Sequence, residues 1–181
     1  MTAAIMGAAA ILLFGHSALT AAEVCRPAQL KTHVEGVDGG LGHVGYALEV
    51  LNISALTCSL DGVPDLRIRT GRSIGQKIPV CANCMDYLFL QRPSEPVTVG
   101  KGESAWFLLG LTMSNEICVQ PTAVEILLPG SSHPLEFSRL AEVEDGAKIA
   151  PGFVQFCGTV NVSAWRAGRF DRSICLTCER N

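Results

Sequence analysis

Four cysteines stand in two Cys-x-x-Cys pairs, and these pairs have the clearest capacity for chemistry in the chain. They are Cys81–Cys84, in a segment rich in turn residues, and Cys175–Cys178, near the C-terminus. Thiolates at this spacing can bind one tetrahedral zinc ion from a tight turn. Cys81, Cys84 and Met85 would also form a soft donor set for Cu(I). The same sulfurs can instead form disulfides, within each pair or between the pairs, that hold the tail to the loop.

A thiol-redox role and covalent haem attachment need neighbours that these pairs lack. A redox dithiol needs a low-pKa thiolate at a helix N-terminus in a βαβ unit, which neither pair has. Haem attachment needs a histidine directly after the second cysteine, where Met85 and Glu179 stand. We therefore expect disulfides among these four cysteines, and keep an extracytoplasmic zinc, copper or thiol-redox module as the alternative; the four are Cys81, Cys84, Cys175 and Cys178.

The histidines do not stand in a recognisable catalytic pattern. His33 and His43 lie within apparent strands, at positions typical of a solvent-facing side, and His133 lies in a turn before a proline. The sequence contains no Gly-x-Ser-x-Gly elbow and no His-Glu-x-x-His helix. A hydrolase would need a pocket that brings His33 or His43 against a serine and a carboxylate. We therefore expect no enzymatic activity and no catalytic residues.

The N-terminal segment predicts export. Residues 1–22 carry no Asp, Glu, Lys or Arg, and an apolar run over 3–14 is followed by small residues up to Ala22. This pattern is typical of a signal peptide, which we expect to be cleaved after Ala22. An uncleaved anchor is the alternative, because roughly 20 apolar residues can span a bilayer. Glu23 and Val24 stand where a lipobox before Cys25 would need small residues, which argues against lipidation.

Composition and charge narrow the class of protein further. The 181 residues carry a formal net charge of −3, which excludes a nucleic-acid binder that relies on a strong basic field. All eight cysteines follow the predicted cleavage point, so in a secreted or periplasmic protein paired disulfides are the default. We expect residues 23–181 to form a single β-sandwich domain with a C-terminal Cys-x-x-Cys tail.

Alternating apolar residues predict a β protein. In Gly42–Leu51 every second residue from Val44 to Val50 is apolar, which indicates a strand with one buried face. Gly71–Asp86 and Arg139–Gly152 have the character of long loops. About eight short strands separated by Gly- and Pro-containing turns favour an antiparallel sandwich of immunoglobulin size. The further expected strands lie around Leu30–Val34 and Leu66–Arg69, and over Pro96–Val99, Ser104–Thr112, Thr122–Leu128, Pro134–Ser138 and Phe153–Ala164.

The segment Asn52–Ile68 resembles the signature of a secreted bacterial family of unknown function that is common in actinobacteria. That signature runs Asn-Thr-Ser, Cys-Thr-Leu and Gly-aromatic-Pro, and Val63 replaces its aromatic residue here. The resemblance implies a disulfide-bonded, immunoglobulin-like sandwich with no established activity. It also implies two disulfides, each stabilising by about 3–4 kcal/mol. These are Cys25–Cys58 and Cys118–Cys157. Later parts of the chain match the family in the same order, at Val97–Ala105, Cys118–Pro121, Ile126–Gly130 and Val154–Cys157.

Two glycosylation sequons and a pair of consecutive aromatic residues allow further predictions. Asn52-Ile-Ser and Asn161-Val-Ser are glycosylation sequons, which we expect to be unmodified, with Asn52 ending a strand in an Asx turn. Trp106 and Phe107 are consecutive and therefore point to opposite faces of their strand. At least one of the two must therefore lie off the main core unless a loop covers it, which makes Trp106 a candidate surface aromatic.

These observations favour a non-enzymatic exported β-sandwich that binds or scaffolds at the cell envelope. We expect an envelope protein or polymer as its partner, no nucleic acid, no resident cofactor and no membrane span once the leader is removed. The mild basic bias of the C-terminal region would suit an acidic polymer, and the alternative, which we favour, is that it serves ordinary solubility; its arginines are Arg166, Arg169, Arg172 and Arg180.

Overall fold

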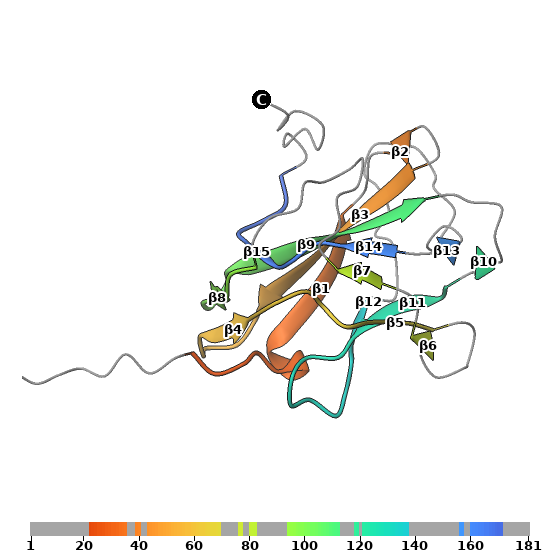
Figure 1. The fold of residues 1–181 in the computed structure, drawn as a ribbon. Helices are drawn as coiled ribbons and strands as arrows, with labels where there is room; N and C mark the ends of the chain where they lie inside the picture. Colours follow the sequence, from red (N-terminus) through yellow and green to blue (C-terminus); the bar gives the residue numbers. More distant parts are fainter. Residues whose placement is uncertain are drawn as a thin grey trace, which may run out of the picture.

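The computed structural model describes ten stretches of the chain. Within them the regular secondary structure is almost entirely β-strand, and the one helix is a single 3₁₀ turn, η1 (Pro27–Gln29). The predicted all-β class is confirmed (Figure 1). The stretches are residues 22–35, 39–40, 43–69, 76–77, 80–82, 94–112, 118–119, 121–137, 156–157 and 160–171.

The larger sheet is built around the longest strands. Its path runs β1-β3-β9-β14-β7, with β2 paired to β3 and β15 paired to β9. All these pairs are antiparallel except β14–β7, which is parallel. The strands are β1 (Leu30–Glu35), β2 (Gly39–Gly40), β3 (His43–Asn52), β7 (Val80–Ala82), β9 (Ser104–Thr112), β14 (Val160–Val162) and β15 (Arg166–Ala167).

A second sheet and two strand pairs complete the described fold. The four-stranded sheet has the order β12-β11-β5-β6, and the pairs are β4–β8 and β10–β13, all antiparallel. Their bounds are β4 (Cys58–Leu60), β5 (Leu66–Arg69), β6 (Gln76–Lys77), β8 (Val97–Val99), β10 (Cys118–Val119), β11 (Ala123–Ile126), β12 (Leu135–Phe137) and β13 (Phe156–Cys157).

The main hydrophobic core lies between the two larger sheets, as in a β-sandwich. Phe107 of β9 is fully buried and makes edge-to-face contacts with Phe137 of β12 and with Trp165, at centroid distances of 6.1 and 4.9 Å. Leu48 of β3 and Ile68 of β5 belong to the same buried cluster. The alternation of Leu66–Arg69 predicts this arrangement correctly, since Leu66 and Ile68 are buried and the two arginines are half-buried.

The outer face of β3 and β9 is also buried, which corrects two predictions. Ala47, Trp106, Leu108 and Phe170 form a second buried cluster there, and Trp106 is 3% exposed. The predictions of one buried face for Gly42–Leu51 and of a surface-exposed Trp106 are therefore wrong. The cause is non-local: the segment Arg166–Phe170, which we call the C-terminal strap, pairs with β9 and covers this face.

Two stretches of the chain depart from their predicted structure. Gly71–Asp86 was expected to be a loop, but it contains β6 and β7, and β7 pairs with the distant β14. Phe153–Ala164 contains two short strands, β13 and β14, in different sheets. Distant partners account for β7, β13 and β14, whereas β6 pairs with the nearby β5.

Several predictions concern residues outside the described stretches. These are the leader up to residue 21, the loop over 139–152 and the tail after residue 171. In the part of the chain that the structure describes, we find no helix with the length and apolarity needed to cross a membrane.

Candidate binding surface

The start of the described chain is fixed against β4. Cys25 and Cys58 form a disulfide with a Cα–Cα distance of 4.8 Å, which is the pair that the family resemblance implies. The backbone N–H of Cys25 donates to the Ser59 carbonyl at 2.9 Å, and the Ser59 N–H donates to the Glu23 carbonyl at 2.8 Å. The Ser59 hydroxyl donates to the Ala22 carbonyl at 3.0 Å. Residues 22–25 therefore lie alongside β4, with one isolated parallel β-bridge between Val24 and Ser59.

Asn52 fixes the connection that leads from β3 to β4. Its side chain is fully buried, and its Oδ1 accepts hydrogen bonds from the Ser54 N–H at 2.9 Å and the Ser54 hydroxyl at 2.8 Å. Its Nδ2 donates to the carbonyls of Leu56 and Val99, each at 2.8 Å. The predicted Asx turn is confirmed, and the same side chain links this turn to β8.

The connection after Asn52 presents apolar side chains to solvent. We call residues Ile53–Thr57 the apolar loop, in which Ile53 is 58% exposed and Leu56 is 65% exposed. Its backbone is held from both ends, because the Ile53 N–H donates to the Gln29 carbonyl at 2.9 Å and the Ser54 hydroxyl bonds with Leu56. Among the described residues, the other large apolar side chain with comparable exposure is Val24, at 40%. The sequence signal was two apolar residues within turn chemistry between two strands.

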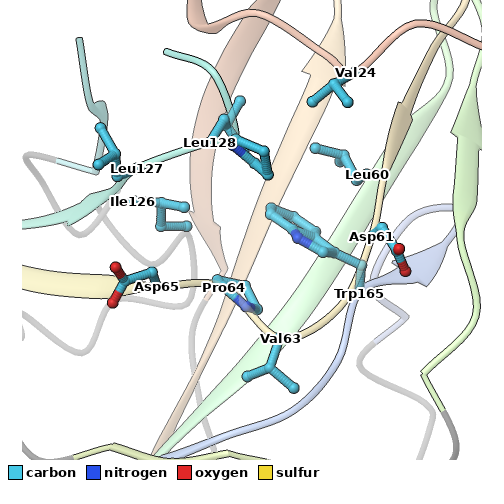
Figure 2. A pocket seen from close by; sticks show the side chains of 11 residues that line it. Val24, Leu60, Asp61, Val63, Pro64, Asp65, Ile126, Leu127, Leu128 and Trp165 are labelled. Atoms are coloured by element: carbon cyan, nitrogen blue, oxygen red, sulfur yellow. The ribbon is translucent and has the colours of Figure 1, made fainter. Parts of the chain in front are cut away.

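A small cavity lies beside this surface, at the other end of β4. It encloses about 110 Å³, which is well below the several hundred Å³ of a typical metabolite site. Figure 2 shows the Trp165 ring between Leu60 and Pro64, with the carboxylates of Asp61 and Asp65 pointing away from the ring. The cavity is therefore an indentation that fits one small side chain.

The turn between β4 and β5 depends on a glycine. Gly62 has φ +73°, a left-handed conformation that side chains with a Cβ rarely adopt. Its carbonyl accepts the Trp165 N–H at 3.3 Å, and its N–H donates to Asp61 Oδ1 at 2.7 Å. Asp61 is thus already engaged in closing the turn, which indicates a structural role for that carboxylate.

A charged cluster on the second sheet is structural in character. Arg69 Nε donates to Glu125 Oε1 at 2.8 Å, and its Nη2 lies 2.7 Å from Glu136 Oε2. Glu125 is buried and stands directly opposite Glu136 across β11–β12, a like-charge pairing that Arg69 offsets. The hydrogen bond with Glu125 raises the pKa of the Arg69 guanidinium above its ordinary value, so the cation persists between the two carboxylates.

The described histidines do not meet a serine and a carboxylate in one pocket. His33 is exposed on β1 and stands opposite Glu49 of β3. Ser104 lies on β9, two strands away from β1, which separates the backbones by about 10 Å. His133 is exposed in a turn next to Ser131, and the side chain of His43 lies outside the described part.

The structure shows the bonding state of some of the cysteines discussed above. Cys81 lies on β7 and is disulfide-bonded, so in this state its sulfur offers no thiolate to a metal. Cys118 is also disulfide-bonded, and the β10–β13 register sets it opposite Cys157, which supports that predicted pair. Cys84, Cys175 and Cys178 lie outside the described residues, where their pairing stays a prediction. The described side chains include no group of three or more potential metal ligands.

Fold and surface together define a disulfide-bonded, mostly antiparallel all-β protein with an ordered apolar loop. The chain belongs to a family described as a domain of unknown function (DUF4232), whose family model matches residues 25–166. No curated protein and no solved structure matches the chain. The matched range includes the Cys25–Cys58 disulfide, the apolar loop and Trp165, and it ends at the first residue of the C-terminal strap.

Proposed function

We propose that this protein is a non-enzymatic, exported module with an immunoglobulin-like sandwich that binds or scaffolds at the cell envelope. The observation that carries the proposal is the apolar loop, in which Ile53 and Leu56 are exposed on a backbone fixed by the buried Asn52. Exposed apolar groups on a flexible segment cost entropy when a partner orders them. Here the folded protein has already met that cost.

The expected gain from binding is substantial for so small a surface. Complete burial of an Ile or Leu side chain contributes about 1.5–3 kcal/mol, and roughly half of each is still available at Ile53 and Leu56. Together these residues would strengthen binding by one to two orders of magnitude, at about 1.4 kcal/mol per factor of ten.

A secreted or periplasmic location is supported by two independent observations. The charge-free segment over residues 1–22 has the pattern of an export signal. The Cys25–Cys58 disulfide belongs to a bond type that persists in oxidising compartments. A secreted bacterial source, as the family resemblance implies, is consistent with both.

The test is cell fractionation of a double variant, Ile53→Ser with Leu56→Ser. We expect the wild-type protein to partition with the envelope and the double variant to shift at least about tenfold toward the soluble fraction. Exposed substitutions of this kind usually change stability by less than about 0.5 kcal/mol, so the fold should persist.

The matched control is Ile53→Leu with Leu56→Met, which keeps the apolar character of both positions. It should partition as the wild type does. If the serine variant also partitions like the wild type, the apolar loop is not the binding surface and the proposal fails.

A further inference from the structure

We propose that the partner of the apolar loop is the surface of a lipid bilayer, the membrane through which the leader passes. This inference rests on the proposed function, since it names the partner of the same surface. The contact that we propose is between apolar side chains and lipid. The test below also distinguishes a lipid partner from a protein or an envelope polymer. Two things carry it: the grouping of the exposed apolar side chains, and the point at which the described chain begins.

Val24 and the apolar loop are both joined to the Cys25–Cys58 disulfide, although the Val24 side chain borders the cavity at the other end of β4. Val24 directly precedes Cys25, and the apolar loop directly precedes Cys58, to which Cys25 is bonded. Asn52 Nδ2 contacts both the Leu56 carbonyl and, at 3.8 Å, Cys58 Sγ. The disulfide and the Asn52 side chain therefore connect both Val24 and the apolar loop to Cys58.

The described chain also begins beside β4. Ala22 and Glu23 are held against Ser59 of β4 by hydrogen bonds from its hydroxyl and its N–H. Figure 1 shows the chain starting beside β4, on the side of the molecule where β8 also lies. Apart from His16, the residues before Ala22 are apolar or small; they include no Asp, Glu, Lys or Arg and are numerous enough to cross a bilayer.

Almost no chain length separates a membrane-inserted leader from β4. An extended residue spans at most about 3.6 Å, and Ala22 is already bound to β4. While the leader lies in the bilayer, before cleavage or as a retained anchor, β4 is therefore held at the membrane surface. Ile53 and Leu56, in the loop that leads directly into β4, are then the exposed apolar side chains at the contact.

The charges at this end indicate which lipids matter. Glu23 and Arg26 form an exposed ion pair, so the two charges nearest the chain start cancel. Attraction to anionic lipid depends on clustered basic residues, which this end does not gather in its described part. The contact should therefore form on zwitterionic lipid and be insensitive to salt.

The experiment uses the complete chain, with its leader uncleaved, synthesised into phosphatidylcholine vesicles whose acyl chains are brominated. Bromine quenches tryptophan fluorescence only by close approach, so Ile53→Trp and Leu56→Trp, made separately, report lipid contact. Trp106 and Trp165 are both buried, and the wild-type chain supplies their background. Thr122→Trp is the control, because Thr122 is exposed at the Arg69 end of β5 and β11, away from β4.

We expect the added fluorescence at positions 53 and 56 to be largely quenched, and that at position 122 to be unaffected. Equal quenching at positions 53, 56 and 122 would show that the apolar loop does not contact lipid in particular, and would overturn the proposal. If quenching is absent while the serine double variant still leaves the envelope fraction, the partner is a protein or polymer and the proposed function survives. If quenching occurs but the serine variant stays with the envelope, the contact exists and the proposed function fails.

Discussion

The two faces of the β3–β9 pair are buried in different ways. On the inner face, Leu48, Phe107 and Leu109 are fully buried beneath a second sheet. On the outer face, Ala47, Trp106 and Leu108 are covered by the C-terminal strap, with Phe170 as its main apolar contact. One face is therefore sealed by many strands and the other by a single short segment.

The outer face also carries polar and charged side chains. Glu49 is buried there and accepts the Phe170 N–H at 3.3 Å, while Arg166 lies 5.0 Å from the centre of the Trp106 ring. Among the described residues, the buried Ser104 hydroxyl finds no hydrogen-bond partner. The inner cluster is a close-packed core, whereas the outer one joins a few apolar contacts to polar links. We expect the strap to open without global unfolding, since regions with fewer buried contacts open at lower free energy.

The largest effect is expected at Phe107. Phe107→Ala removes contacts with Phe137 and Trp165 from a site with no exposure, and should lower the free energy of unfolding by about 3–5 kcal/mol. Urea denaturation measures the loss, with Phe107→Leu as the milder control. If Phe107→Ala lowers the free energy of unfolding by less than Phe170→Ala does, the inner face is not the more stabilising of the two.

A smaller and more local effect is expected at Phe170. Phe170→Ala removes the edge-to-face contact with Trp106, at 5.1 Å, from the rim of the outer cluster, and should cost about 1–2 kcal/mol. Hydrogen exchange should accelerate mainly at the Gly168 amide, which donates to the Ser104 carbonyl across the strap. Faster exchange spread equally through β3 and β9 would show that the strap does not open separately.

The smallest effect is expected at Ser104 and has the opposite sign. Ser104→Ala removes a buried hydroxyl that no described residue hydrogen-bonds, and should raise the free energy of unfolding by a few tenths to about 1 kcal/mol. Urea denaturation is again the measurement. A loss of stability would mean that the hydroxyl contributes to the outer face, which would then be better optimised than we infer.

Local sequence predicts part of this fold, but it does not predict which distant segments come together. Local alternation predicts β9 at Ser104–Thr112 with its observed bounds, and β3 to within one residue. It fails for β7, whose partner β14 lies some eighty residues later, and for the covering of Trp106. Periodicity shows which residues share a face, but a face is buried only when a distant segment reaches it.

The candidate binding surface also has one feature that the local sequence predicts and one that it does not. The Asx turn at Asn52 is encoded by neighbouring residues, and the sequence predicts it. The exposure of Ile53 and Leu56 depends on how the loop leaves the sheet, and their residue types alone would suggest burial. Turn chemistry is local, whereas an exposed apolar patch is a property of the folded chain.

The burial of Asn52 has a practical consequence for producing this protein in a eukaryotic secretory host. Asn52-Ile-Ser is an acceptor sequence for N-linked sugar, and Nδ2 is the atom that would carry it. In the folded protein that nitrogen donates to Leu56 and Val99 and is shielded from solvent. A glycan and the native loop therefore exclude each other, so the glycosylated fraction would report directly on chains that were modified before they folded.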